Sequence, residues 1–186
     1  MSEQAKTRQR PADVYFFATC VVDQFFPGAG MDAITLLEKQ GIRVHFPEEQ
    51  TCCGQPAYTS GFPDEARKVA AHQLTLFPND WPVVVPSGSC AGMMKHHYPP
   101  LFAADPQRKA KAEALSARIY EFTDFLVNVL GWQPEDKGGD CTVVLHTSCS
   151  ARREMGVHLT GRKLLGGLDK VTVAMQDHES ECCGFG

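Results

Sequence analysis

Two Cys-Cys-Gly triplets, Cys52-Cys53-Gly54 and Cys182-Cys183-Gly184, constrain this sequence more than any other feature. At this composition such a triplet arises by chance only about 0.03 times in a chain of this length. Each triplet follows one upstream cysteine at nearly the same distance, with 31 residues between Cys20 and Cys52 and 32 between Cys149 and Cys182. Two rare motifs with matched spacing indicate a duplicated unit.

The segments before the upstream cysteines also correspond. Residues 14–20 align with 143–149 at an offset of 129, and the triplets align at an offset of 130. A further cysteine, Cys90, follows the first triplet by 36 residues, and the second unit has no equivalent before Gly186. We therefore expect the second unit to be incomplete, with the counterpart of Cys90 at about position 220 of a longer chain.

Short apolar runs alternate with helical segments along the chain. The β-branched and aromatic runs predict strands at 14–18, 43–46, 83–85, 142–146 and 171–175, and apolar spacing predicts helices at 31–40, 64–76, 106–118, 121–130 and 160–165. This order predicts an α/β fold of three layers around a parallel sheet. All the cysteines except Cys141 follow a predicted strand, at the edge where such folds build their sites.

The repeat also divides the chain. We expect a mobile tail over residues 1–13, a first unit over 14–133, a linker over 134–140 and a partial second unit over 141–186. The two units are expected to be related by pseudo-two-fold symmetry.

Composition and charge argue against nucleic-acid binding and against a membrane-spanning segment. The formal net charge of −4 gives no basic field for nucleic acid, and no apolar run approaches the roughly 20 residues that cross a bilayer. The basic tail is not followed by the apolar core of a secretory signal. We expect a cytoplasmic protein, in which reduced thiols serve metal or redox chemistry rather than structural disulfides.

Converging thiolates are the preferred ligands of iron-sulfur clusters, and a glycine beside a cysteine pair lets the backbone approach a bulky inorganic core. Adjacent cysteines point in different directions and serve two irons more easily than one zinc. Two alternatives stay open: thiol-disulfide chemistry at the vicinal cysteines, and a structural zinc module. Neither a catalytic triad, a carboxylate pair nor a glycine-rich phosphate loop is present, so we expect no catalytic residues.

Other polar residues near the cysteines receive plainer interpretations. Cys141 has no counterpart and is expected to be structural. His96 and His97 are expected on a solvated helix face, and Lys95, Arg152 and Arg153 on the solvated surface. His146 is expected either to contact a cluster sulfur or to be a core histidine with satisfied hydrogen bonds.

The motifs resemble those of cysteine-rich CCG-domain proteins, which include the cysteine-rich subunit of heterodisulfide reductase and the iron-sulfur subunits that act in glycolate and lactate oxidation. The resemblance rests on the segments 17–20, 46–48, 52–57, 87–90, 146–150 and 182–186. It implies an electron-transfer subunit of a complex that oxidises lactate or a related 2-hydroxy acid, with a second iron-sulfur protein and a further subunit as partners.

The resemblance also implies the ligands. The first cluster motif is matched by Cys20, Cys52, Cys53 and Cys90, and the second by Cys149, Cys182 and Cys183. One departure stands out, because Met93 replaces a fifth cysteine that heterodisulfide reductase uses for a noncubane cluster. The first motif therefore has four thiolates at most, which suits an ordinary [4Fe-4S] cluster, and aerobic preparation is expected to strip an exposed one.

Overall fold

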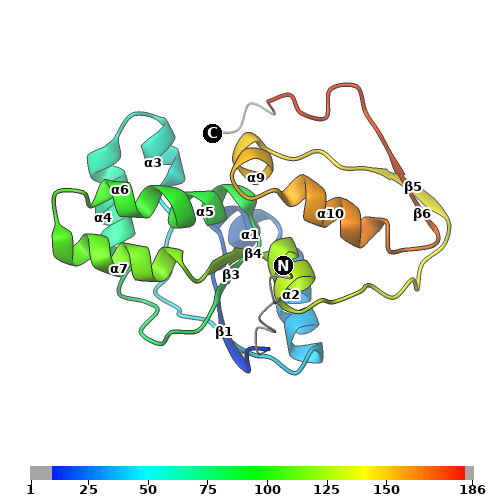
Figure 1. Ribbon diagram of the computed structural model, residues 1–186, viewed down its shortest axis with the longest axis horizontal. Coiled ribbons are helices and arrows are strands. Elements are labelled where there is room, and N and C mark those ends of the chain that lie inside the picture. Colours follow the sequence, from blue (N-terminus) through cyan, green and yellow to red (C-terminus); the bar gives the residue numbers. More distant parts are fainter. Residues whose placement is uncertain (1–9, 183–186) are drawn as a thin grey trace, which may run out of the picture.

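A computed structural model describes residues 10–182 and shows two parallel sheets (Figure 1). The larger sheet has the strand order β2-β1-β3-β4, and all its neighbouring strands are parallel. Its strands are β1 (Asp13–Phe16), β2 (Arg43–His45), β3 (Val83–Val85) and β4 (Ile119–Glu121). The predicted parallel α/β architecture is confirmed.

Helices cover both faces of the larger sheet. Side chains of β1 alternate between the faces, with Tyr15 in one hydrophobic cluster and Val14 and Phe16 in another. Strands buried on both sides carry such continuous apolar runs. The cluster that holds Tyr15 is closed by α4 (Pro63–Gln73), η1 (Met93–His97), α6 (Tyr98–Leu101) and α7 (Pro106–Ser116), and the other by α2 (Pro27–Lys39) and η2 (Phe125–Val129).

Several elements differ from the sequence expectation. Helix α2 begins at Pro27 rather than at residue 31, because proline is well suited to the first turn of a helix. Strand β4 was not expected, since its three residues stand between two helical patterns. The expected helix over 121–130 starts only after Glu121, as α8 (Phe122–Asp124), and continues as the π-helical turns of η2.

The smaller sheet repeats part of the larger one. Its parallel strands β5 (Cys141–Val144) and β6 (Val171–Ala174) are joined through α9 (Cys149–Arg153) and α10 (Val157–Leu165). The first half has the same order, in which β1 leads through α1 (Cys20–Phe25) and α2 to the parallel neighbour β2. Figure 1 shows this smaller sheet set apart from the larger one, on the far side of α10.

Helix α5 (Gly88–Gly92) joins the two halves by packing against α9. A Cβ atom built on Gly88 would lie 2.5 Å from the Cα atom of Ala151. Only glycine at position 88 allows so close an approach between the two helices. Within residues 10–182 no helix is both long and apolar enough to cross a membrane.

Candidate thiol sites

The first three cysteine motifs all follow carboxyl ends of strands in the larger sheet. Cys20 begins α1 after β1, the first triplet follows β2 and leads into α3 (Gln55–Thr59), and Cys90 lies in α5 after β3. The chain leaves β1 toward β2 on one side and returns to β3 on the other, so the ends of β1 and β3 flank the topological switch point. Open parallel sheets bind their ligands at this position.

Four thiols meet there and form the first thiol site. The Sγ atoms of Cys20 and Cys52 lie 4.0 Å apart. The Cys53 thiol interacts electrostatically with those of Cys52 and Cys90, so the four thiols form one cluster. Cys53 is 1% exposed, whereas Cys20 and Cys52 are half-buried, and the site therefore opens to solvent at one end.

Gly54 fixes the shape of the triplet. Its φ of +86° lies in the left-handed region, and its backbone nitrogen donates to the Cys52 Sγ at 3.4 Å. A Cβ atom at this position would also lie 3.3 Å from the carbonyl oxygen of Ala66. The glycine therefore allows the turn that brings the adjacent thiols between Cys20 and Cys90.

Side-chain hydrogen bonds hold the first triplet loop, residues 46–53, against β1 and α4. Gln50 donates from Nε2 to the carbonyl oxygen of Phe16 at 3.0 Å. The buried Gln73 on α4 donates to the Thr51 hydroxyl at 2.7 Å. These bonds tie the loop to β1 and to α4, which places Cys52 beside Cys20.

Tyr98 supports the site from within the core and is a residue that the sequence patterns did not identify. It is fully buried, and its hydroxyl donates to the carbonyl oxygen of Cys53 at 2.9 Å. Burial, together with the nearby thiols of Cys53, Cys90 and Cys52, raises its pKa well above the ordinary value. An aromatic residue at the start of a short helix gives no sequence signal for this role.

The Tyr98 hydroxyl can be tested by removing it alone. Tyr98→Phe keeps the ring but leaves the Cys53 carbonyl without its buried donor, a loss that costs about 1–3 kcal/mol. We expect the free energy of unfolding in urea to fall by this amount with an unchanged m-value. An unchanged free energy would show that the hydroxyl does not support the triplet.

The three thiols of Cys20, Cys52 and Cys53 have raised pKa values. Burial is the main cause at Cys20, and the hydrogen bond to Cys53 followed by burial is the cause at Cys52. At Cys53 the hydrogen bond with Cys52 lowers the pKa, but the hydrogen bond with Cys90 and burial outweigh it. The folded metal-free protein thus holds these thiols protonated, and metal binding must release their protons. The raised pKa values contribute to the free energy of unfolding of the metal-free protein. This contribution is fully present below the unfolded thiol pKa of about 8.5 and is lost as pH rises from there through the folded-state values.

This protonation and burial predict unequal thiol reactivity. At pH 7.5 we expect iodoacetamide to modify the exposed Cys141 at least about tenfold faster than Cys53 in the metal-free protein. Peptide mass spectrometry over a time course measures both rates. Equal rates would mean that the first thiol site is open in solution.

The second thiol site is built from α9 and the loop after β6. Cys149 is the first residue of α9, and the Ser148 hydroxyl caps this helix by accepting from the Ala151 nitrogen, as Thr19 caps α1. Cys182 is exposed at the end of that loop, and Cys183 lies outside the described residues.

His146 joins these two segments. It lies in the turn before Cys149 and hydrogen-bonds through Nε2 to the carbonyl oxygen of Glu181 at 3.1 Å. It is exposed, so it is not the core histidine that was one of its two expected roles. Cys141 begins β5, at the opposite end of that strand from the turn that leads to Cys149.

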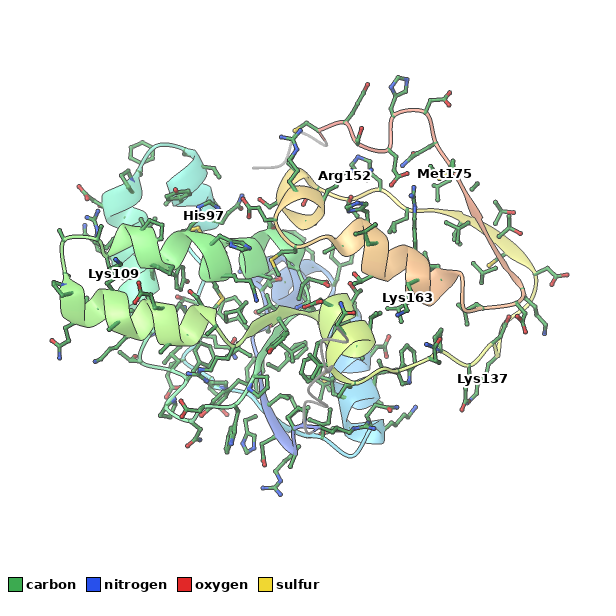
Figure 2. All side chains as sticks on the ribbon, in the orientation of Figure 1. His97, Lys109, Lys137, Arg152, Lys163 and Met175 are labelled. Carbon is green, nitrogen blue, oxygen red and sulfur yellow. The ribbon has the colours of Figure 1, made fainter. Side chains whose placement is uncertain are left out.

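Three polar side chains differ from their expected solvated positions, and Figure 2 labels two of them, His97 and Arg152. The Lys95 ammonium donates to the carbonyl oxygen of Ile119 at 2.7 Å. His97 is half-buried and lies 3.0 Å from the carboxylate of Glu154, the residue that follows α9. Arg152 forms an ion pair with Glu179. Sequence spacing did not predict these contacts, because their partners come from distant segments.

The donor set suits a polynuclear group. In the described residues no three His, Cys, Asp or Glu side chains are arranged around a single metal ion. The first thiol site brings four thiols together. Iron-sulfur clusters bind one thiolate at each of several irons. Four thiols therefore provide the ligand type and number that such a cluster uses.

Comparison with known proteins gives the class of this fold and site. Residues 14–95, which contain the whole first thiol site, match the CCG cysteine-rich domain. The resemblance noted from the motifs is thereby confirmed.

Similar proteins extend the match over nearly the whole chain. The chain is 44% identical over 176 residues to lactate utilization protein A 1 of Bacillus mycoides (strain KBAB4), covering 93% of this chain and 71% of that protein. It is 42% identical over 175 residues to lactate utilization protein A of Geobacillus sp. (strain WCH70), covering 93% and 72%. The chain belongs to the lactate utilization protein A family.

Proposed function

We propose that this protein is an iron-sulfur electron-transfer subunit of a complex that oxidises lactate or a related 2-hydroxy acid. The observation that carries the proposal is the convergence of four thiols from three strand ends at the switch point of a parallel sheet. The names of the relatives support lactate as the substrate of the complex. This chain is proposed to pass electrons and to contain no catalytic residue of its own.

The ligands of the first site are proposed to be Cys20, Cys52, Cys53 and Cys90. Bound there, a [4Fe-4S] cluster would supply one-electron oxidation and reduction. The chain's own residues orient the thiols: Gly54 donates to the Cys52 sulfur, and Tyr98 holds the Cys53 carbonyl. The second site is proposed to use Cys149, Cys182 and Cys183.

We further propose that the chain consists of two CCG-type repeats related by a pseudo-two-fold axis, with the second incomplete. The matching order of strand, two helices and parallel strand supports this, as do the equivalent hydroxyl caps of α1 and α9. The proposed boundaries are a tail over 1–13, repeats over 14–133 and 141–186, and a linker over 134–140.

The proposed partners are a second iron-sulfur protein and a further subunit of the complex, acting in the cytoplasm. The surface of α1 supports protein docking beside Cys20. This helix buries none of its residues, and Phe25 and Phe26 are 70% and 62% exposed. Apolar side chains exposed together mark an interaction surface.

The test is to measure iron, acid-labile sulfide and the EPR spectrum of dithionite-reduced protein after anaerobic purification. About four or more irons per chain with a reduced-cluster signal is the expected result. Zinc alone would favour the structural zinc module. No metal after anaerobic reconstitution, with loss of redox activity on alkylation, would favour thiol-disulfide chemistry at the vicinal cysteines.

A further inference from the structure

Glu179 is a buried carboxylate in the second triplet loop, residues 175–182. It is 6% exposed, and its two oxygens meet arginines from two different helices. Arg152 on α9 donates to Oε1 at 2.8 Å, and Arg162 on α10 pairs with Oε2. The carboxylate thus ties the loop to both helices of the smaller sheet.

The opposite charges of Glu179 and the two arginines make the loss of either partner costly in stability. A buried ion pair that loses one partner leaves an uncompensated charge, and breaking it is strongly destabilising. The hydrogen bond from Arg152, together with the positive charge of Arg162, lowers the pKa of Glu179 below its ordinary value. The group is therefore ionised at neutral pH, and both arginines keep their partner.

The contact lies between two weaker attachments of the same loop. At its start, Arg162 contacts the Met175 sulfur at 3.0 Å, and near its end His146 binds the Glu181 carbonyl. Figure 2 shows Arg152 at α9 and Met175 on the segment that leaves β6. Cys182 follows Glu179 by three residues, so fixing Glu179 limits where that thiol lies.

The first half has no such contact at the equivalent positions. Glu49 aligns with Glu179 at the triplet offset of 130, and Asp23 aligns with Arg152 at the offset of 129. Both equivalents are acidic and exposed. The first triplet loop is held instead by the amide side chains of Gln50 and Gln73 and by His72, which hydrogen-bonds to the carbonyl oxygen of Glu49.

We propose that Glu179 is a positioning residue: through Arg152 and Arg162 it holds the second triplet loop against α9, so that Cys182 is presented to Cys149. The effect of Glu179 on iron binding rests on the proposed function, whereas its effect on the position of residues 175–182 does not. The two triplet loops are therefore held differently: a buried carboxylate and two arginines hold the second, and hydrogen bonds without an ion pair hold the first.

Hydrogen exchange of the metal-free protein tests the position of the loop. In Glu179→Gln we expect backbone amides of residues 176–182 to exchange at least about tenfold faster, with those of residues 46–53 unchanged. Glu49→Gln is the matched control, because it makes the same change at the exposed equivalent, and neither loop should respond. The double variant Arg152→Gln/Glu179→Gln should exchange no faster than Glu179→Gln, because the two side chains act through one contact.

Iron uptake tests whether holding residues 175–182 in place is needed for metal binding at the second thiol site. In a Cys53→Ser background, which leaves the second site alone, Glu179→Gln should lose most of the remaining iron and its EPR signal, whereas Glu49→Gln should keep both. Unchanged exchange in Glu179→Gln overturns the proposal. Faster exchange with undiminished iron and an identical EPR signal reduces Glu179 to a structural residue and also overturns it.

Two further results separate this proposal from the proposed function. If unsubstituted protein takes up no iron but Glu179→Gln exchanges faster in the loop, the electron-transfer function fails and the positioning of the loop stands. If Glu179→Gln does not fold, Arg152→Gln replaces it, because this variant removes the same contact from the more exposed partner.

Discussion

Cys53→Ser protein, reconstituted anaerobically, is expected to contain about four fewer irons per chain than the unsubstituted protein. Serine keeps the size of the side chain but removes the soft thiolate in the middle of the first thiol site. Cys53 contacts both Cys52 and Cys90, so its loss divides the chain of four thiols in two. Iron and acid-labile sulfide assays measure the change, and the EPR signal of the first site should disappear with the metal.

Cys141→Ser is the control for this experiment. Cys141 is exposed at the start of β5 and contributes to neither thiol site, so iron content should be unchanged. Loss of iron from this variant, or its full retention in Cys53→Ser, would show that the ligands have been assigned wrongly.

Gly88→Ala is expected to lower the free energy of unfolding by about 1–3 kcal/mol, the range observed when a methyl group is forced into a packed interface. The added methyl would collide with Ala151 on α9, where the backbones of α5 and α9 meet. Both helices carry candidate ligands, Cys90 and Cys149, so separating them also disturbs the relation between the two thiol sites. Urea unfolding measures the effect.

Two further variants make this prediction specific. Gly28→Ala makes the same chemical change on α2, where nothing lies within 4 Å of the added atom, and it should be neutral or slightly stabilising. Ala151→Gly placed in the Gly88→Ala protein should restore part of the lost stability, because it removes the methyl on the opposite side. A Gly88→Ala protein as stable as the unsubstituted one would mean that the two helices are not held in contact.

The sequence predicted the parallel α/β architecture and which cysteines follow strands. The position of Cys20, Cys52 and Cys90 is predictable because parallel strands direct their carboxyl ends to one edge of a sheet. Short β4 was not predictable, because three residues between helices carry no period. Tyr98 and Glu179 were missed for another reason: each acts on a segment far away in sequence, and only the folded chain brings the partners together.

The charged side chains show the same limit. Lys95 and Arg152 have the composition of a solvated surface, and exposure is the usual state of such residues. Their half-buried contacts are made with the carbonyl oxygen of Ile119 and the carboxylate of Glu179, which no local sequence pattern connects to them. The sequence repeat predicts the second group of cysteines, but it does not predict the ion pairs that hold the loop before Cys182.

The first thiol site also has a topological consequence. Its four sulfur atoms belong to segments separated by 31 and 36 residues, and each segment leaves a different strand of the larger sheet. A group bound to all four closes two long loops at once, as a pair of crosslinks would, and removes much of the conformational freedom of the unfolded chain. The largest gain in stability is expected at α1, because this helix has no buried residue that packs it against the core. A cluster bound at the first thiol site would therefore also stabilise the N-terminal half against unfolding.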